Sequence, residues 1–245
     1  MLNVKILTAY PDMFPGTLKY SIIGNALKEK KWSLDIINLH DYGYDQRKSI
    51  DDEPFGGGPG MVIRPDVVEK ALLSIDYQSQ ITRKLIYLTP AGKALKQSNL
   101  AEFSQFNQLI ILCGRFEGVD QRAIEILKFS EISIGDYVLA GGEIAAQVLV
   151  EGCIRLLPGV LGHPESLLEE SFSNNLLEYP QYTRPQVWID TQNKKHGVPE
   201  VLVSGHHENI KKWRKDKSIE KTKFIRPDLI KKLKLDKKEQ DKKND

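Results

Sequence analysis

The sequence contains little cysteine, and this limits the classes of protein to which it can belong. Only Cys113 and Cys153 occur among 245 residues, each inside an apolar stretch. We therefore expect two buried, reduced thiols rather than a disulfide framework. No CxxC or HxxxH spacing accompanies them, which argues against a metal site built on these cysteines.

Long hydrophobic runs are also missing. No stretch approaches the roughly 18 apolar residues that a membrane span needs. The first residues, MLNVKILTAYPDMF, lack the basic and apolar regions of a signal peptide. The composition, 40% hydrophobic and 28% charged, is typical of a globular protein. We expect a cytoplasmic protein without membrane contact, built as one large domain or two modest ones.

The formal net charge of +2 hides an uneven distribution. Residues 191–245 contain 17 Lys and Arg against 9 Asp and Glu, whereas residues 1–190 contain 18 against 24. A basic part beside an acidic body predicts a separate module that faces an anionic partner, and nucleic acid is the first candidate. The final stretch, KKLKLDKKEQDKKND, is too polar to pack, so we expect a solvated, frayed tail there.

Strand and helix patterns alternate in the first part of the chain. Residues 4–8 predict a strand, residues 20–30 a helix and residues 32–39 a second strand, the spacing of a βαβ unit with a parallel sheet. Pro65 begins another predicted helix, because proline is favoured in a first turn. Residues 201–235 predict further helices.

Three more predicted strands, residues 84–89, 109–113 and 131–134, are each followed by a glycine-bearing segment. Continuous apolar runs of this kind fit strands that are buried on both faces. Ligands of open α/β sheets bind at the carboxyl ends of the strands. The segments PAG, GRFEG and SIGDYVLAGGE are therefore predicted to converge on one pocket.

The last of these segments, residues 133–143, contains three glycines and leads into an apolar run predicted to be helical as far as Leu157. Glycine costs folding entropy, so a positive φ or a close approach of the backbone to a ligand usually explains it. A loop that feeds a helix suits a small polar ligand, although a tight turn without a ligand explains the pattern as well. The glycine spacing does not match GxGxxG, which disfavours a Rossmann-type site.

Six motifs occur here in a fixed order: DDEPFGGGPGM, YLTPAG, LCGRFEG, SIGDYVLAGGE, LLPGVLGH and YTRP. One glycine loop alone is weak support, but the ordered set is highly specific. Over residues 1–230 the chain closely resembles the bacterial tRNA (guanine-N1)-methyltransferases, the TrmD family of the SPOUT superfamily. That family methylates guanosine-37, next to the anticodon.

The resemblance implies an α/β fold of the SPOUT type, a parallel sheet with a deep trefoil knot, plus a small C-terminal helical domain. It implies an S-adenosylmethionine-binding catalytic domain over residues 1–160 and an interdomain linker over 161–175. A helical tRNA-binding domain over 176–235 and a disordered basic tail over 236–245 would follow. It further implies a homodimer with active sites at the subunit interface, and dependence on Mg²⁺ at a site that no ligand cluster of the sequence identifies.

The resemblance also carries the cofactor contacts over, motif by motif. Adenine needs an apolar slot and backbone hydrogen bonds, which Ile134, Tyr137 and Leu139 would supply. Glu117 would orient a metal ion or the amino group of the methionine moiety. The complete set of expected S-adenosylmethionine contacts is Tyr87, Leu88, Thr89, Pro90, Gly114, Glu117, Ser133, Ile134, Gly135, Asp136, Tyr137, Val138, Leu139, Gly141 and Gly142.

For catalysis the resemblance implies Glu170 as the base for the guanine N1 proton and Arg155 as the group that stabilises charge on O6. Many relatives carry aspartate where Glu170 stands, so the arm here is longer by one methylene. Simpler interpretations remain open. Residues 166–169 fit a helix capping box, and Arg155 lies four residues after Glu151, the spacing of a helix-surface ion pair.

The expected tRNA contacts lie in loops. A long polar loop such as residues 41–60 is usually functional or disordered, and a plain flexible loop is its alternative. Other functions also remain open, namely another SPOUT RNA methyltransferase that acts on ribose 2′-OH, or a non-catalytic RNA-binding protein of the same fold. The expected tRNA-binding residues are Asp51, Gly58, His163, Tyr182 and Arg184, the last suited to phosphate.

Overall fold

The structure, a computed structural model, describes residues 1–76, 80–162, 170–172 and 174–233. The chain divides into two compact units, residues 1–162 and 163–245. His163, the capping box expected at 166–169 and the tail expected at 236–245 lie outside the described residues. Within the described ranges, no helix is both long and apolar enough to cross a membrane.

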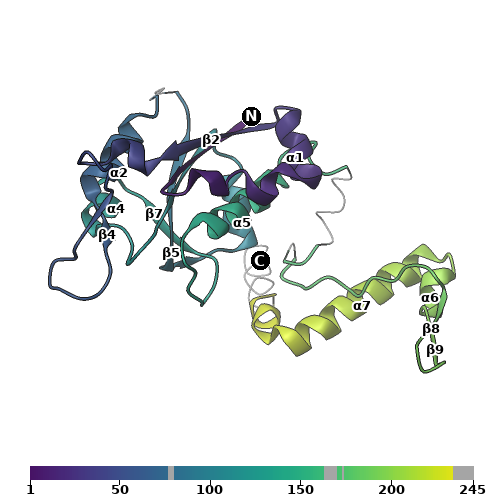
Figure 1. The fold of residues 1–245 in the computed structure, drawn as a ribbon. Coiled ribbons are helices and arrows are strands. Elements are labelled where there is room, and N and C mark those ends of the chain that lie inside the picture. The colour runs from purple at the N-terminus through teal and green to yellow at the C-terminus, as the bar shows by residue number, and fades with distance from the viewer. Residues whose placement is uncertain (77–79, 163–169, 173, 234–245) are drawn as a thin grey trace, which may run out of the picture. The chain divides into compact units, whose positions relative to one another are not determined.

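The first unit contains a five-stranded sheet in the order β2-β1-β6-β5-β7, with every pair parallel (Figure 1). β6 lies in the middle and is buried along its whole length, as expected for a parallel strand covered on both faces. The predicted α/β class with a parallel sheet is confirmed. The strands are β1 (Leu2–Thr8), β2 (Trp32–Asn38), β5 (Arg83–Ala94), β6 (Gln108–Cys113) and β7 (Ser130–Ser133).

Helices cover both faces of this sheet (Figure 1). On one face lie α1 (Ser21–Lys28), α3 (Gln97–Phe103) and α5 (Glu143–Ile154), and on the other lie α2 (Pro65–Leu73) and α4 (Gln121–Ile126). Successive residues of a strand point to opposite faces. Leu109, Ile111 and Cys113 of β6 therefore belong to the first core, whereas Ile110 and Leu112 belong to the second.

Short elements connect these layers. The 3-10 helices η1 (Pro11–Met13) and η2 (Gly16–Lys19) follow β1, and η3 (Leu39–Tyr42) follows β2. β3 (Asp51–Asp52) pairs antiparallel with β4 (Val62–Ile63). Part of the predicted loop at 41–60 is thus regular structure, and this small ladder closes the glycine-rich segment between its two strands.

Two predicted boundaries are wrong. β5 does not stop at Thr89 but stays extended to Ala94, with a bulge between Leu88 and Lys93 in its pairing with β7. Gly92 is needed there for space, since a Cβ atom on it would lie 2.6 Å from the backbone carbon of Glu131. The helix after Gly142 ends at Ile154 rather than at Leu157.

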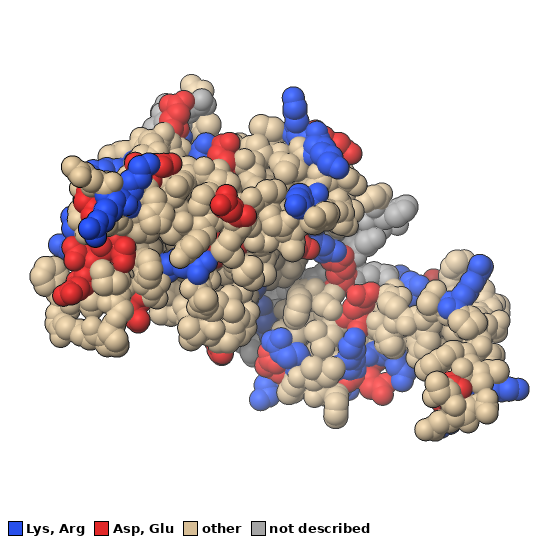
Figure 2. Space-filling view, in the orientation of Figure 1, with Lys and Arg blue, Asp and Glu red and all other residues tan. Residues whose placement is uncertain are grey.

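The second unit contains a β-hairpin followed by helices. β8 (Val187–Ile189) pairs antiparallel with β9 (Lys195–Gly197), and α6 (Glu200–Val203) and α7 (His207–Ile225) follow. The helices agree with the sequence pattern, but the hairpin was not predicted. In Figure 2, Lys and Arg side chains on the visible face of this unit alternate with Asp and Glu rather than forming one continuous basic surface.

Candidate functional site

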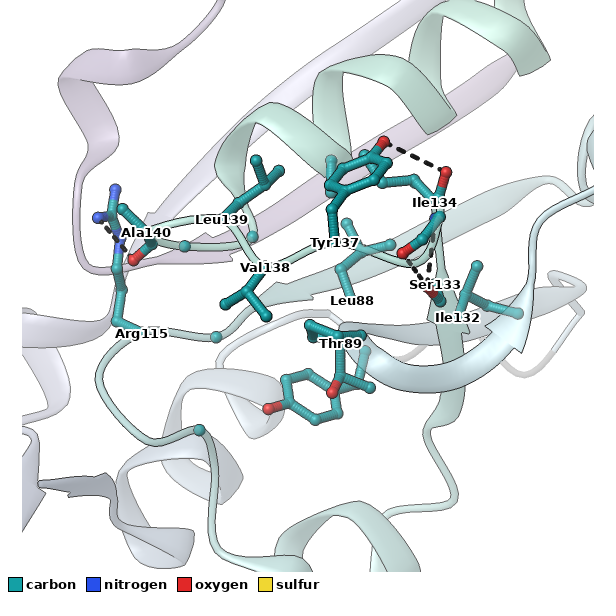
Figure 3. Close-up of a pocket in the computed structure, with 18 of the residues that line it drawn as sticks. Leu88, Thr89, Arg115, Ile132, Ser133, Ile134, Tyr137, Val138, Leu139 and Ala140 are labelled. Carbon is teal, nitrogen blue, oxygen red and sulfur yellow. Dashed lines mark hydrogen bonds between the residues drawn. The ribbon is translucent and has the colours of Figure 1, made fainter. Parts of the chain in front are cut away.

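A cavity of about 250 Å³ lies at the carboxyl ends of the sheet strands (Figure 3). Its walls come from residues 87–90 within β5, residues 114–118 after β6, and residues 132–142 at the end of β7 and after it. Ala145 of α5 completes the lining. The predicted convergence is confirmed for the segments GRFEG and SIGDYVLAGGE, at the edge of the sheet where α/β proteins bind ligands. Of the predicted segment PAG only Pro90 lines the cavity.

The cavity brings together the residues expected to contact a cofactor. All of them line it except Asp136, whose side chain is exposed. Sequence reasoning missed several neighbours within or beside the same motifs. Two of them, Arg115 and Phe116, lie between the predicted Gly114 and Glu117, and this position could have identified them. The missed lining residues are Arg115, Phe116, Gly118, Ile132, Ala140 and Ala145.

Glycine makes room for the ring of Tyr87 in the wall of the cavity. A Cβ atom on Gly114 would lie 3.0 Å from this ring, and one on Gly118, where φ is +117°, would lie 3.1 Å from its hydroxyl oxygen. Burial raises the pKa of the Tyr87 phenol, so the hydroxyl stays neutral near pH 7. The packed ring gives the cavity an aromatic wall with one polar end.

The segment after β7 is joined to the segment after β6 by backbone. The amide of Gly142 donates a 2.9 Å hydrogen bond to the carbonyl of Gly114. A Cβ atom on Gly142 would lie 2.9 Å from Cys113 Cα. Neither Gly141 nor Gly142 has a positive φ. Close packing, rather than unusual backbone dihedrals, therefore explains this glycine pair.

Apolar side chains and local hydrogen bonds shape the remaining wall (Figure 3). The Ser133 hydroxyl donates to the carbonyl of Gly135 at 3.0 Å and accepts from its amide at 3.2 Å. The Tyr137 hydroxyl donates to the Ile134 carbonyl at 3.3 Å. Val138, by contrast, is 83% exposed. The rim thus presents apolar surface that a ligand or a second chain would cover.

The glycine-rich loop is anchored beside this cavity. The side chain of Glu117 occupies the space that a Cβ atom on Gly60 would need. Arg64 holds the base of the loop through 3.1 Å contacts with both Asp52 and Asp66, and its guanidinium stacks 3.9 Å from the ring centre of Tyr44. The ladder and this ion-pair cluster therefore place the loop next to the cavity wall.

The two expected tRNA contacts in this loop, Asp51 and Gly58, differ in their exposure to solvent. Asp51 is half-buried and pairs with Ile63 in the β3–β4 ladder, whereas Gly58 is exposed in the segment between these strands. Phe55, at the tip, is 99% exposed. The tip is thus free to meet a large substrate.

The other predicted functional residues lie outside the cavity lining. Arg155 caps the carboxyl end of α5, where its amide donates to the Glu151 carbonyl at 3.1 Å. Glu170 is half-buried in the second unit, where Arg184 is exposed and the Tyr182 ring lies 6.1 Å from that of Trp213. Their expected roles stay predictions.

The described residues contain no group of three or more His, Cys, Asp or Glu side chains that could hold a metal ion. Both cysteines are buried and free, as predicted. Burial raises the pKa of Cys153 to about 12, and burial together with the nearby Glu143 carboxylate raises that of Cys113. Both thiols are therefore structural rather than reactive.

The sheet and the glycine-walled cavity at its carboxyl edge define an α/β protein with a built ligand site. The family model described as tRNA (Guanine-1)-methyltransferase TrmD matches residues 2–232. The chain therefore belongs to the TrmD family of tRNA (guanine-N1)-methyltransferases. That family has the SPOUT fold. The parallel sheet of this chain agrees with that fold and is consistent with a trefoil knot.

Similar proteins carry the same description. A tRNA (guanine-N(1)-)-methyltransferase of Ehrlichia canis (strain Jake) is 46% identical over 229 residues, covering 93% of this chain and 95% of the relative. Proteins of that name from Rhodospirillum rubrum and Wolbachia pipientis wMel are each 49% identical, covering 93% of this chain and 92% and 95% of the relatives. The similarity thus extends through both units.

Proposed function

We propose that this protein methylates N1 of guanosine-37 in tRNA, with S-adenosylmethionine as the methyl donor. The observation that carries the proposal is the cavity, whose lining matches the family motifs in a chain that is similar to tRNA (guanine-N1)-methyltransferases throughout its described length. In this proposal residues 1–160 form the catalytic domain, residues 161–175 a linker and residues 176–235 a tRNA-binding domain.

The cavity residues fit the proposed cofactor. Leu88, Ile134 and Leu139 provide apolar surface for adenine, and the glycines let the backbone approach the ligand closely. The carboxylate of Glu117 also lines the cavity, where it complements a positively charged amino group. When bound, S-adenosylmethionine supplies a methyl group activated by its sulfonium charge.

Transfer to guanine N1 requires that the N1 proton leave and that negative charge on O6 be stabilised. We assign the first role to the Glu170 carboxylate and the second to the Arg155 guanidinium. A free glutamate has a pKa of about 4.3 and is a weak base for this proton. The cation of Arg155 would compensate by making N1 more acidic as charge moves to O6.

A homodimer with active sites at the subunit interface is part of the proposal. Ile144 and Val148 lie one helical turn apart on α5 and are 51% and 49% exposed. Together with the exposed Tyr137 and Val138 they supply apolar surface close to the cavity. Such surface is typical of a protein interface, and a second copy of the chain would cover it.

The proposed tRNA contacts are Asp51, Gly58, His163, Tyr182 and Arg184, of which His163 lies outside the described residues. The target base has to leave its stack to reach the cavity, which costs a few kcal/mol. Phosphate contacts from the basic second unit would offset that cost and would weaken with salt.

Because the substrate is tRNA, we place the activity in the cytoplasm, and we expect it to require Mg²⁺.

The test is methylation of two tRNA transcripts that differ only in having guanosine or adenosine at position 37, followed by nucleoside mass analysis. We expect N1-methylguanosine from the first transcript and no product from the second. A 2′-O-methylated nucleoside would instead support a ribose methyltransferase. Failure to bind S-adenosylmethionine in calorimetry, with tRNA binding intact, would support a non-catalytic RNA-binding protein.

A further inference from the structure

Glu143 is a fully buried acidic residue that the proposed chemistry leaves without a role. It is the first residue of α5, follows the Gly141-Gly142 pair directly and does not line the cavity. A buried carboxylate is costly unless it is paired. An acid is favoured at a helix N-terminus, but that effect does not require complete burial. The contacts of this carboxylate therefore indicate what it does.

Both carboxylate oxygens of Glu143 have a partner from another part of the chain. The Thr8 hydroxyl, at the end of β1, donates a 2.8 Å hydrogen bond to Oε1. Arg115 Nη2 lies 3.0 Å from Oε2 as an ion pair, while Oε2 accepts no hydrogen bond and Nη2 donates to Met13 Sδ at 3.2 Å. The side chain of Arg115 is only 17% exposed. The charge on Glu143 thus fixes a guanidinium that belongs to the cavity wall.

Arg115 connects two of the three wall segments. It lines the cavity between Gly114 and Phe116, and its Nη1 donates a 3.2 Å hydrogen bond to the carbonyl of Ala140 in the segment after β7 (Figure 3). Its guanidinium stacks 4.2 Å from the ring centre of Tyr10. A Cβ atom on Gly141 would meet its side chain. The position of this guanidinium therefore determines the position of the backbone at 140–141.

We propose that Glu143 is a positioning residue for cofactor binding. Its buried carboxylate orients Arg115, and Arg115 in turn holds the Ala140 carbonyl and the wall formed by residues 138–142. The link runs from Thr8 through Glu143 and Arg115 to Ala140. The inference rests on the proposed function only in naming S-adenosylmethionine as the ligand.

The first test is Glu143→Gln, which keeps the shape of the side chain and its contact with Thr8 but removes the charge that holds Arg115. Loss of a charge-assisted contact of this kind is expected to raise the Kd for S-adenosylmethionine roughly tenfold to a hundredfold. Calorimetry measures the Kd at a temperature where circular dichroism shows the variant to be folded. Glu69→Gln, an exposed glutamate of α2, is the matched control and should bind as the unmodified protein does.

A second variant separates positioning from stability. The double change Glu143→Leu with Arg115→Met replaces the buried pair by apolar groups, which commonly preserves or raises stability. We expect the double variant to melt at a higher temperature than the Glu143→Gln variant. It should nevertheless bind the cofactor as weakly as Glu143→Gln does, because no group then holds the Ala140 carbonyl.

The outcomes are distinguishable. Recovery of cofactor affinity together with stability in the double variant, or unchanged affinity in Glu143→Gln, would overturn the positioning role. Absence of cofactor binding in the unmodified protein would instead contradict the proposed function itself.

Discussion

The backbone amide of Glu117 donates a 2.9 Å hydrogen bond to the carbonyl of Met61, so the cavity wall and the glycine-rich loop share an attachment point. A second bond of 2.9 Å joins the amide of Ile63 to the carbonyl of Gly118. Beyond these bonds, Phe55 is followed by Gly56, Gly57 and Gly58, where an added Cβ atom would meet nothing within 4 Å. A fixed base and an unsupported tip are typical of a segment that contacts a substrate rather than one that stabilises a fold.

Phe55→Ala is expected to weaken the use of tRNA and leave cofactor binding unchanged. An aromatic side chain that stacks on a base contributes about 1–3 kcal/mol, so kcat/KM for tRNA should fall by roughly five- to a hundredfold. Steady-state methylation at varied tRNA concentration measures this, while calorimetry checks the cofactor Kd. The control is Leu73→Ala, an exposed apolar residue of α2. Equal kinetics in the two variants would count against a tRNA contact at Phe55.

Gly141→Val is expected to abolish S-adenosylmethionine binding while the protein stays folded. The added side chain would meet the side chain of Arg115 rather than backbone, so it would displace this guanidinium and the cavity wall that it holds. Gly142→Val should also lower the melting temperature, because its neighbours are the backbone atoms of Cys113 and Gly114. Gly197→Ala, in open space on β9, serves as the control. Normal cofactor binding by Gly141→Val would show that this segment is not a cofactor wall.

Glu170→Gln is expected to reduce single-turnover methylation at least a hundredfold, about the lower end of what general bases contribute. The cofactor Kd and the tRNA Kd should stay within twofold, since the change keeps size and removes only the proton acceptor. Glu170→Asp, which restores a carboxylate and matches many relatives, should recover most of the rate. If Glu170→Gln methylates at the original rate, the residue is not the base.

Cys153 should remain unreactive towards thiol reagents at pH 8 in the folded protein, because burial raises its pKa to about 12 and little thiolate forms. The unfolded thiol has an ordinary pKa of 9.0. Between pH 9 and pH 12 the unfolded chain loses this proton and the folded chain keeps it, so this group lowers stability as pH rises through that window. Urea unfolding at pH 8 and pH 10.5 tests the effect, and Cys153→Ala should show a weaker pH dependence.

The parallel sheet was predictable because it depends on strong local signals, whereas the residues that line the cavity were named through the resemblance of the ordered motifs to a family. Apolar runs such as that of β6 identify strands buried on both faces, and the glycine motifs that follow identify the ends of β6 and β7. The extension of β5 was not predictable, since Pro90 and Gly92 indicate a turn. Only the packing of Gly92 on β7 shows why the chain remains extended.

Other features depend on contacts between distant residues, which no local pattern contains. Arg115 would be read from its motif as a solvated loop residue, and Glu143 as an ordinary acid in a first helical turn. Their pairing, with Thr8 more than a hundred positions away in the sequence, becomes visible only in the fold. The β8–β9 hairpin has strands of three residues each, too short for a period-2 pattern to stand out.

α5 begins at the cavity and ends before Arg155, and its 12 residues correspond to a length of about 18 Å. An arginine side chain is shorter than that and Arg155 does not line the cavity of its own chain, so we expect each cavity to receive Arg155 from the second copy of the proposed dimer. Two antiparallel copies of α5, side by side, would bring each Arg155 to the opposite cavity. Mixing Gly141→Val chains with Arg155→Ala chains, each inactive alone, would then restore activity, because half of the sites in every mixed pair would be complete.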